Sequence, residues 1–447
     1  MGVVTEQRAT TKDGYQPGVF VVRHRHGKPG LIFALALDLV LAISSISPSP
    51  SHVRSIEAAG PLVPRTIHLQ GFLSGIVSDA QTGRVFVAAW SMRSATPRGT
   101  VDVLDARTGL PVSTVAVGYV LTGIGADVRA GHVFVLDGAG GPYLGLRGAV
   151  SMLDARSGKV LHTATVGFDP QEIAVDTHTG RAFVLNTTDH TLSVLDTHSG
   201  ALLRTVPAGP DAREIVADER TGRIFVADVA FTNEIRAFDA WTGEPLHTTS
   251  FGKDAGLDFG RAPAVDTRTG RVFVANSAYP STVAILDGRT GLLQRTIPVR
   301  EPVREVFGYA ALAVDARSGR LFGVYPDASG SPVKQGAVDT FDASSGGLLH
   351  TTLAPVGSGS ITVDMPRARV FVVSQGQADN TGHASTLGRV SVLDARTGAL
   401  RCILTGGHGR RSDSFDPTGA VTIDEQSGHI FVFDRHQGTI SVLDMTC

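Results

Sequence analysis

The sequence predicts an all-β fold: an eight-bladed β-propeller of four-stranded blades, with the last blade closed by an N-terminal strand. Three observations predict it: a repeat that occurs eight times, apolar segments between Asp- and Gly-containing turns, and an unpartnered segment ahead of the first repeat. Glycine supplies 52 of 447 residues, well above its usual share of about 7%, without a collagen-like period. This composition is typical of a chain with many turns and short strands.

A phenylalanine marks the second strand of every repeat. These residues are Phe86, Phe134, Phe183, Phe225, Phe273, Phe322, Phe371 and Phe431. They are separated by 48, 49, 42, 48, 49, 49 and 60 residues. Periods of this length with four strands each are typical of propeller blades. We expect each Phe to fill the space between two neighbouring blades.

An aspartate marks two turns of every repeat. The first set ends the first strand: Asp79, Asp127, Asp176, Asp218, Asp266, Asp315, Asp364 and Asp424. The second set closes the third strand: Asp105, Asp154, Asp196, Asp239, Asp287, Asp342, Asp394 and Asp444. Asp bonds the backbone two residues on, and the Gly that usually follows supplies the positive φ of the turn. Calcium needs several carboxylates in one loop, so we interpret these residues as turn formers.

The eighth repeat is incomplete. Full repeats end in a fourth strand such as residues 202–209, whereas the eighth stops at Cys447, before that strand. A matching segment, residues 64–71, precedes the first repeat. We expect it to complete the eighth blade and so remove free strand edges that invite aggregation.

The strands FVAN and FVLN and the turns VDxxTGR and VLDxxTG resemble the YVTN-repeat family of β-propellers. Phe stands where that family often has Tyr, and Ala or Leu where it has Thr; the resemblance covers residues 64–447. It implies a relation to extracytoplasmic binding or surface-layer proteins, and related propellers include lactonases and haem d1 carriers. The chain has two Trp residues for eight blades, which argues against WD repeats and tryptophan-docked quinoproteins.

The first 60 residues differ from the repeats. Residues 1–46 form a basic region with an apolar run at 31–43, and residues 47–60 form a Ser- and Pro-containing linker to the propeller at 61–447. A basic flank, a short apolar core and small residues follow one another in the order of a secretory signal. The prediction is export, or membrane anchoring through residues 31–46, and an extracytoplasmic location. A disordered tail is the alternative.

Composition excludes several classes of protein. A net charge of −2 provides no global field for nucleic acid, and two Cys are too few for a disulfide scaffold or a Cys-based metal centre. The motifs HExxH, GxSxG, CxxCH and the Walker loop are absent. The sequence therefore indicates no cofactor. Cys402 takes the fourth-strand place that Thr holds in other repeats, and it would bridge to Cys447 in an oxidising compartment.

Basic residues also hold repeat positions. The second strand opens with Arg84, Arg181, Arg223, Arg271, Arg320 and Arg369, or with His132 and His429. We expect these residues to pair with turn carboxylates. A fourth-strand position is shared by His162, His247 and His350 and by Arg65, Arg204, Arg295 and Arg401.

Loop lengths vary at one end of the repeats only. The first-to-second and third-to-fourth turns are uniform, whereas other loops extend to residues 374–389 and 406–419. A rigid scaffold with varied loops on one face is typical of a binding surface. We therefore predict that the variable loops contact the ligand.

Two glutamates stand out on that face. The position four residues before each first-strand Asp is small in six repeats, but Glu172 and Glu214 hold it in adjacent repeats, beside Arg213 and Arg261. Two carboxylates near a channel mouth would bind a polar or cationic group, or share a proton. Alternatively, Glu–Arg pairing merely fixes strand ends.

Three histidines form a second candidate cluster. His383, His408 and His436 lie outside the repeat positions, in loops of the last two repeats. Three convergent His side chains would hold a metal. Solvated surface residues are the alternative.

The sequence thus predicts an extracytoplasmic, non-enzymatic and monomeric binding scaffold. Its partner is a protein or a small polar ligand on the variable-loop face. One alternative is a lactonase-type hydrolase, with Glu172 and Glu214 as acid and base at the channel mouth. Another is a haem d1-like or metal carrier that uses the three histidines.

Overall fold

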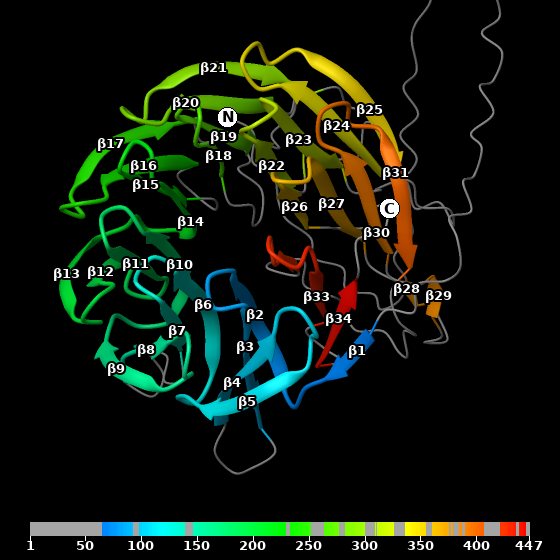
Figure 1. The fold of residues 1–447 in the computed structure, drawn as a ribbon. Helices are drawn as coiled ribbons and strands as arrows, with labels where there is room; N and C mark the ends of the chain where they lie inside the picture. The colour runs from blue at the N-terminus through cyan, green and yellow to red at the C-terminus, as the bar shows by residue number, and fades with distance from the viewer. Residues whose placement is uncertain are drawn as a thin grey trace, which may run out of the picture. The chain divides into compact units, whose positions relative to one another are not determined.

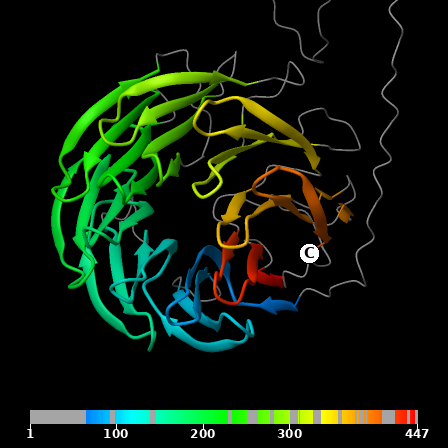
Figure 2. The same cartoon turned by 45° about the horizontal axis from the view of Figure 1, so that its top comes forward.

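The described chain consists of strands arranged as eight sheets around a ring (Figure 1, Figure 2). The computed structural model describes residues 65–92, 98–138, 146–228, 233–251, 263–276, 282–299, 309, 311–325, 336–354, 360–374, 377–378, 384–386, 389–405, 421–434 and 438–443. The chain divides into two units, Met1–Ser55 and Ile56–Cys447, and every described residue belongs to the second. In this part of the chain, no helix is long and apolar enough to span a membrane.

Each blade is a four-stranded antiparallel sheet whose strands follow one another in order, and the first four blades hold β2 to β17. Blade 1 contains β2 (Phe72–Asp79), β3 (Arg84–Ser91), β4 (Arg98–Asp105) and β5 (Pro111–Ala116). Blade 2 contains β6 (Leu121–Asp127), β7 (His132–Asp137), β8 (Ala149–Asp154) and β9 (Val160–Thr165). Blade 3 contains β10 (Pro170–Asp176), β11 (Arg181–Asn186), β12 (Thr191–Asp196) and β13 (Leu202–Pro207). Blade 4 contains β14 (Ala212–Asp218), β15 (Arg223–Asp228), β16 (Glu234–Asp239) and β17 (Pro245–Ser250).

The remaining blades follow the same plan. Blade 5 contains β18 (Ala264–Asp266), β19 (Arg271–Asn276), β20 (Thr282–Asp287) and β21 (Leu293–Pro298). Blade 6 contains β22 (Ala311–Asp315), β23 (Arg320–Tyr325), β24 (Gly336–Asp342) and β25 (Leu348–Ala354). Blade 7 contains β26 (Ile361–Asp364), β27 (Arg369–Ser374), β30 (Arg389–Asp394) and β31 (Leu400–Thr405), and its second-to-third loop holds the pair β28 (Gln377–Ala378) and β29 (Ala384–Thr386). Blade 8 contains β32 (Val421–Ile423), β33 (Ile430–Asp434), β34 (Thr439–Leu443) and β1 (Arg65–His68).

The N-terminal strand closes the ring. β1 pairs antiparallel with β34, with Arg65 opposite Val442 and Ile67 opposite Ile440. In Figure 1 the blue β1 lies beside the red β34, although these strands come from opposite ends of the chain. The predicted fold class is therefore confirmed, including the closure of the last blade.

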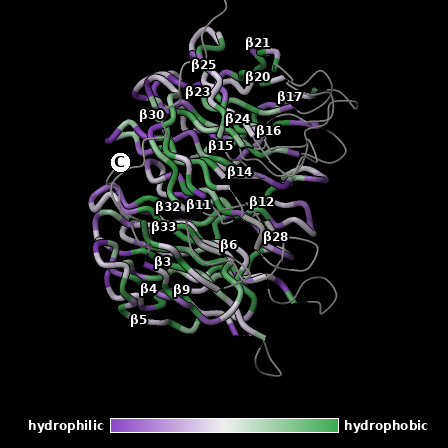
Figure 3. Tube along the Cα trace, turned by 90° about the vertical axis from the view of Figure 1, so that its right-hand side faces the viewer, coloured by the Kyte–Doolittle hydropathy of each residue, from purple (hydrophilic) through white to green (hydrophobic). Residues whose placement is uncertain are grey.

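Apolar side chains fill the spaces between blades. All eight repeat Phe residues are fully buried, and each packs into a cluster shared with the next blade. Phe225 of blade 4, for example, packs with Val272 and Val274 of blade 5. Across the closure, Phe431 packs with Val85 and Val87 of blade 1. Hydrophobic residues accordingly follow the strands, and hydrophilic residues gather in the turns (Figure 3).

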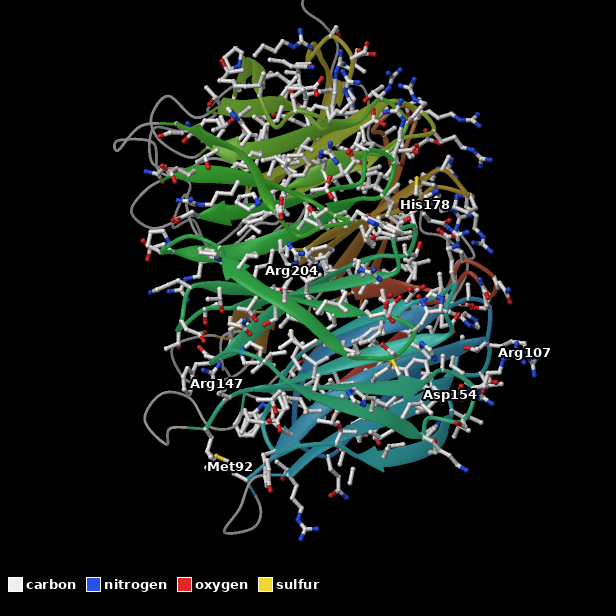
Figure 4. All side chains as sticks on the ribbon, turned by 90° about the vertical axis from the view of Figure 1, so that its left-hand side faces the viewer. Met92, Arg107, Arg147, Asp154, His178 and Arg204 are labelled. Atoms are coloured by element: carbon white, nitrogen blue, oxygen red, sulfur yellow. The ribbon has the colours of Figure 1, made fainter. Side chains whose placement is uncertain are left out.

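The two ends of the ring differ. We call the end with the first-to-second and third-to-fourth turns the turn face, and the other end the variable-loop face. The side-chain view supports this division, because Arg107 and His178 lie on one side of the ring, whereas Met92 and Arg147 lie on the other (Figure 4). Innermost and third strands end at the turn face, and fourth strands begin there.

Aspartates shape both kinds of turn. Asp176 Oδ1 accepts the N–H groups of His178 and Thr179 at 2.9 and 3.0 Å, and Gly180 follows at a φ of 65°. Asp196 accepts the N–H groups two and three residues further on in the same way. The interpretation of these residues as turn formers is confirmed for the turns that the structure describes.

The first residue of the second strand links neighbouring blades. Arg223 forms an ion pair with Asp239 at 3.1 Å, and its Nε donates to the Arg289 carbonyl of blade 5 at 3.1 Å. The same ion pair joins Arg84 to Asp105, Arg181 to Asp196 and Arg320 to Asp342. His429 Nδ1 lies 2.9 Å from the Ala106 carbonyl, so this link also spans the closure. The expected pairing with turn carboxylates is confirmed at these arginines.

The outer strands of blades 1 to 7 share a β-bulge. In blade 3, Leu202 pairs with Leu195 and Arg204 with Val194, which leaves Leu203 as the extra residue. The same register shift occurs in the other six outer strands. A bulge twists an edge strand and so hinders pairing with another chain.

This bulge corrects one prediction about blade 7. Cys402 pairs with Val392, which is the place that Arg204 holds in blade 3, and Arg401 is the extra residue. The predicted alignment of Arg401 with Arg204, and of Cys402 with the Thr position, is therefore wrong by one residue. The spacing in the sequence agrees with the structure, because Cys402 follows Asp394 by eight residues, as Arg204 follows Asp196. Cys402 is disulfide-bonded, and the chain's other cysteine, Cys447, lies outside the described residues.

Candidate functional site

The two candidate glutamates occupy one repeat position in neighbouring innermost strands. Glu172 of β10 pairs with Leu185, and Glu214 of β14 pairs with Ala227; Gly75 holds the same place in blade 1. A register shift precedes each of these residues. β10 and β14 pack against the same apolar cluster. The sequence was therefore right to place both glutamates near the inner edge of adjacent blades.

Their predicted partners are placed differently. Arg213 is the extra residue at the register shift of β14, and its side chain is exposed. Glu172 and Glu214 are half-buried, and each interacts with another group. Arg261 lies outside the described residues, so its expected place beside the glutamates stays a prediction.

Blade 4 adds polar residues that the sequence analysis missed. Asp228 at the end of β15 is fully buried, and it accepts the Asp211 N–H at 3.2 Å. Arg236 donates to Glu234 at 2.6 Å. Gly209 has a φ of 123°, and a Cβ there would lie 2.6 Å from Arg236 Nε and 3.1 Å from Asp228 Oδ2. The missing side chain therefore lets the blade 3–4 loop pass directly over this polar group.

Blade 3 carries a second acidic group at the same end. Asp169, at a φ of 54°, accepts hydrogen bonds from Gln171 Nε2 at 2.6 Å and from Thr187 Oγ1 at 2.9 Å. Asp189 accepts the Phe168 N–H at 2.9 Å. These bonds fix the loops on both sides of β10 and hold their carboxylates in place.

Acidic side chains outnumber arginines at this end of blades 3 and 4. Among the described residues, the acidic ones are Asp169, Glu172, Asp189, Asp211, Glu214, Asp228 and Glu234. Arg213 and Arg236 provide guanidinium groups there, and the guanidinium of Arg147 from blade 2 lies over the Phe168 ring, beside Asp169. Carboxylates accept hydrogen bonds and attract cations. This end is thus suited to a cationic group or to one with many hydrogen-bond donors.

Exposed apolar side chains lie next to the acidic group. Phe72, Met92, Tyr119 and Leu146 of blades 1 and 2 have exposed fractions of 43%, 67%, 56% and 57%. All four lie at the variable-loop ends of their strands or in the adjoining loops. Exposed apolar residues that lie together mark interaction sites more often than scattered ones do.

A buried polar group between blades 5 and 6 was also missed. Tyr309 Oη donates to Asp339 at 2.8 Å, and Thr351 Oγ1 donates to the same carboxylate at 2.6 Å. Burial and the charge of Asp339 raise the pKa of Tyr309. A Cβ on Gly323 would lie 2.6 Å from the Tyr309 ring, so the glycine makes room for it. The group is enclosed in the apolar core, which indicates a role in packing.

A signal for the missed residues was present in the repeat. Most third strands carry Ser or Ala at the place of Arg236, and most second strands carry a bulkier residue at the place of Gly323. Counting from the third-strand Asp and from the repeat Phe shows both departures in the sequence. Within the described residues, no three His, Cys, Asp or Glu side chains form a group that could hold a metal. His383, His408 and His436 lie outside those residues, so the metal hypothesis is not tested.

The fold places this protein in the class of β-propellers, and its turn face and variable-loop face differ in their side chains. A family model described as "Outer membrane protein assembly factor BamB" matches residues 146–318. The match extends from the end of blade 2 into blade 6 and covers less than half of the chain. It supports a BamB-like type of propeller, whereas the YVTN-repeat family is not confirmed. No curated protein matches the chain.

Solved structures share the fold at low identity. BamB from Moraxella catarrhalis is 16% identical with a TM-score of 0.53, over 85% of this chain and 98% of that one. Sqt1 from Saccharomyces cerevisiae is 14% identical with a TM-score of 0.61, over 86% of this chain and 98% of that one. The dihydro-heme d1 dehydrogenase NirN is 16% identical with a TM-score of 0.52, over 87% and 74%. At these identities the likeness shows the fold alone.

Proposed function

We propose that this protein is an extracytoplasmic, non-enzymatic scaffold that binds a protein partner with its variable-loop face. The observation that carries this proposal is the unequal variation of the loops at the two ends. Described third-to-fourth turns all have one length, as between β4 and β5 or β30 and β31. Blade-to-blade connections range from residues 117–120 to residues 406–420. Variation confined to one face is typical of a binding surface on a constant scaffold.

The chemistry of the face suggests the kind of partner. Acidic residues of blades 3 and 4 lie beside the apolar residues of blades 1 and 2. A protein segment with basic and apolar side chains would complement both parts. The match to a family described as an assembly factor supports a role in protein contacts. The description of that family also names the outer membrane, which supports an extracytoplasmic location. A small cationic ligand bound by the acidic part alone is the alternative.

Site-specific photo-crosslinking tests the proposal. A benzoylphenylalanine replaces Tyr119 on the variable-loop face or, as a control, the exposed Leu349 at the turn-face end of the outer strand β25. In the native cells we expect a discrete protein adduct at position 119 and none at 349. The double substitution Glu172→Gln and Glu214→Gln should abolish that adduct and leave the melting temperature nearly unchanged.

A matched variant distinguishes the loss of this particular site from a general loss of negative charge. Glu244→Gln with Glu425→Gln removes two carboxylates from the turn face, and the adduct should persist. Adducts of equal yield at both crosslinker positions contradict the proposal. Unfolding of the Glu172/Glu214 variant would mean that these residues hold the strands together. Lactone hydrolysis that vanishes in the same variant would favour the hydrolase alternative.

A further inference from the structure

The turn face displays exposed Arg and His side chains at the tips of its turns. Two residues after the Asp, third-to-fourth turns carry Arg107, Arg156, His198, Arg289 and Arg396, and first-to-second turns carry Arg129, His178, Arg220, Arg268 and Arg317. All ten side chains are exposed. None takes part in an ion pair with a described residue. The tips of the turns are therefore basic, although the chain as a whole has a net charge of −2.

Most acidic groups of this face lie behind those tips, whereas Glu244 and Glu425 are exposed. The first-to-second turn aspartates are at most 1% exposed. Those of the third-to-fourth turns accept N–H groups of their own turns, and several pair with the first Arg of the second strand. Glu244 pairs with Arg204, and Glu219 accepts the Thr177 N–H at 3.1 Å. At long range these carboxylates offset the positive field of the basic tips. An anion is therefore attracted only when it comes close to the tips.

An apolar rim surrounds the basic tips. Twenty large hydrophobic residues are exposed in the described part of the chain, and fourteen of them lie at the turn face. Twelve follow the third-to-fourth turns at the beginning of the outer strands: Leu110, Val112, Val160, Leu161, Leu202, Leu203, Leu246, Leu292, Leu293, Leu348, Leu349 and Leu400. The other two are Trp241, which is 63% exposed, and Met365.

The chain enters the propeller at this same rim. β1 is the outer strand of blade 8, and outer strands begin at the turn face. Arg65 accordingly donates to the Thr108 carbonyl, in the third-to-fourth turn of blade 1. The apolar run at residues 31–43 precedes this point in the sequence. A membrane that holds this run would therefore be tethered to the turn face through residues 44–64, at most about 70 Å if fully extended.

We propose that the turn face binds the surface of an anionic phospholipid bilayer. Cations together with exposed aliphatic and Trp side chains suit the boundary between headgroups and acyl chains. Turns of equal length place the basic tips at similar heights, which suits a flat partner. The apolar rim distinguishes a bilayer from a soluble polyanion, because a polyanion would use the cations alone. Binding here leaves the variable-loop face turned away from the membrane.

Vesicle sedimentation with the full chain tests this proposal. The vesicles contain either phosphatidylcholine alone or about one third phosphatidylglycerol, so any contribution of the apolar run is present in both. The test variant is Arg107→Gln, Arg156→Gln and Arg289→Gln. The control variant removes three exposed arginines of the variable-loop face: Arg98→Gln, Arg147→Gln and Arg213→Gln. Melting temperatures confirm that both variants are folded.

We expect the phosphatidylglycerol-dependent binding to fall about tenfold or more in the turn-face variant and to change little in the control. High salt should weaken the binding of the wild type towards that of the variant. With Trp90→Phe as background, Trp241 fluorescence should shift to the blue on anionic vesicles only. Equal loss in both variants, or none in the turn-face variant, overturns the proposal. Loss of binding to soluble polyglutamate without loss on vesicles also overturns it, and assigns the face to a soluble polyanion.

Discussion

The two turns of each blade use the same chemistry in different surroundings. In the first-to-second turns, burial raises the pKa of Asp176 and Asp218, and the turn hydrogen bonds offset this only in part. In the third-to-fourth turns, the pKa of every described aspartate is lowered. For Asp154 the largest cause is the Ser157 hydroxyl, followed by the Ser157 N–H. Burial near the axis therefore disfavours the carboxylate at Asp176 and Asp218, whereas the turns at the rim favour it.

The largest expected effect of this difference is acid sensitivity. A lowered pKa means that stability is present above the ordinary pKa of about 4 and is lost as the pH falls towards the native value. For Asp394, for example, burial raises the pKa, but hydrogen bonds from Arg401 and from the residues of its own turn lower it by more. The net pKa of Asp394 is about 2. Seven such residues should together cost about 3 kcal/mol between about pH 5 and pH 2, allowing for solvent screening.

Urea unfolding at a series of pH values measures this loss. Asp176 and Asp218 act in the opposite direction, because a raised pKa contributes stability at low pH that is lost as the pH rises through it. They should offset a small part of the acid effect. A free energy of unfolding that stays constant down to about pH 2 would mean that the outer aspartates do not favour the carboxylate.

Single Asp→Asn substitutions should change stability with opposite signs at the two turns. Asn keeps an acceptor oxygen for the turn N–H groups but removes the charge. At neutral pH, Asp154→Asn should lower the free energy of unfolding by about 1 kcal/mol, because Ser157 loses a charged acceptor. Asp176→Asn should raise it by about 0.5 kcal/mol, because a buried charge is removed. Chemical denaturation of both variants decides the matter, and equal signs would refute the comparison.

A further expected effect concerns the one described first-to-second turn in which Ala replaces the usual Gly. Ala368 has a φ of 51°, in the left-handed region that costs a residue with a Cβ about 1 to 2 kcal/mol. Ala368→Gly should raise the free energy of unfolding by up to about 1 kcal/mol, after the entropy cost of Gly is subtracted. Gly180→Ala, at a φ of 65°, is the matched reverse change and should lower it. A melting temperature that moves in the same direction in both variants speaks against backbone strain.

The repeat allowed the fold to be predicted from the sequence. It did not show how residues at equivalent repeat positions differ in their register and surroundings. The spacing of Phe86 and its equivalents specified eight blades, and residues 64–71 specified the closure, because both depend on local pattern. The place of Cys402 was missed although its spacing from Asp394 equals that of Arg204 from Asp196. The opposite surroundings of the two Asp sets were missed because burial depends on the position of a strand in the ring.

For the candidate site, the sequence identified Glu172 and Glu214 because they break a run of small residues at one repeat position. It did not identify Asp228 or Arg236, which the pairing of β15 with β16 brings together beneath the loop at Gly209. Contacts of this kind depend on three-dimensional packing between a strand end and a loop. The basic residues at the tips of the turn face can be identified in the sequence, but the sequence does not show that their side chains are exposed.

The closure of blade 8 sets the order of events during synthesis. Thr66 leaves the ribosome long before its partner Ser441 is made. At about 5 to 20 residues per second, translating the intervening chain takes about 20 to 75 seconds. During that time the first strand has no sheet to join, and blade 1 has no eighth blade beside it. The ring therefore closes only after blade 8 has been made, so the earlier blades need protection until then.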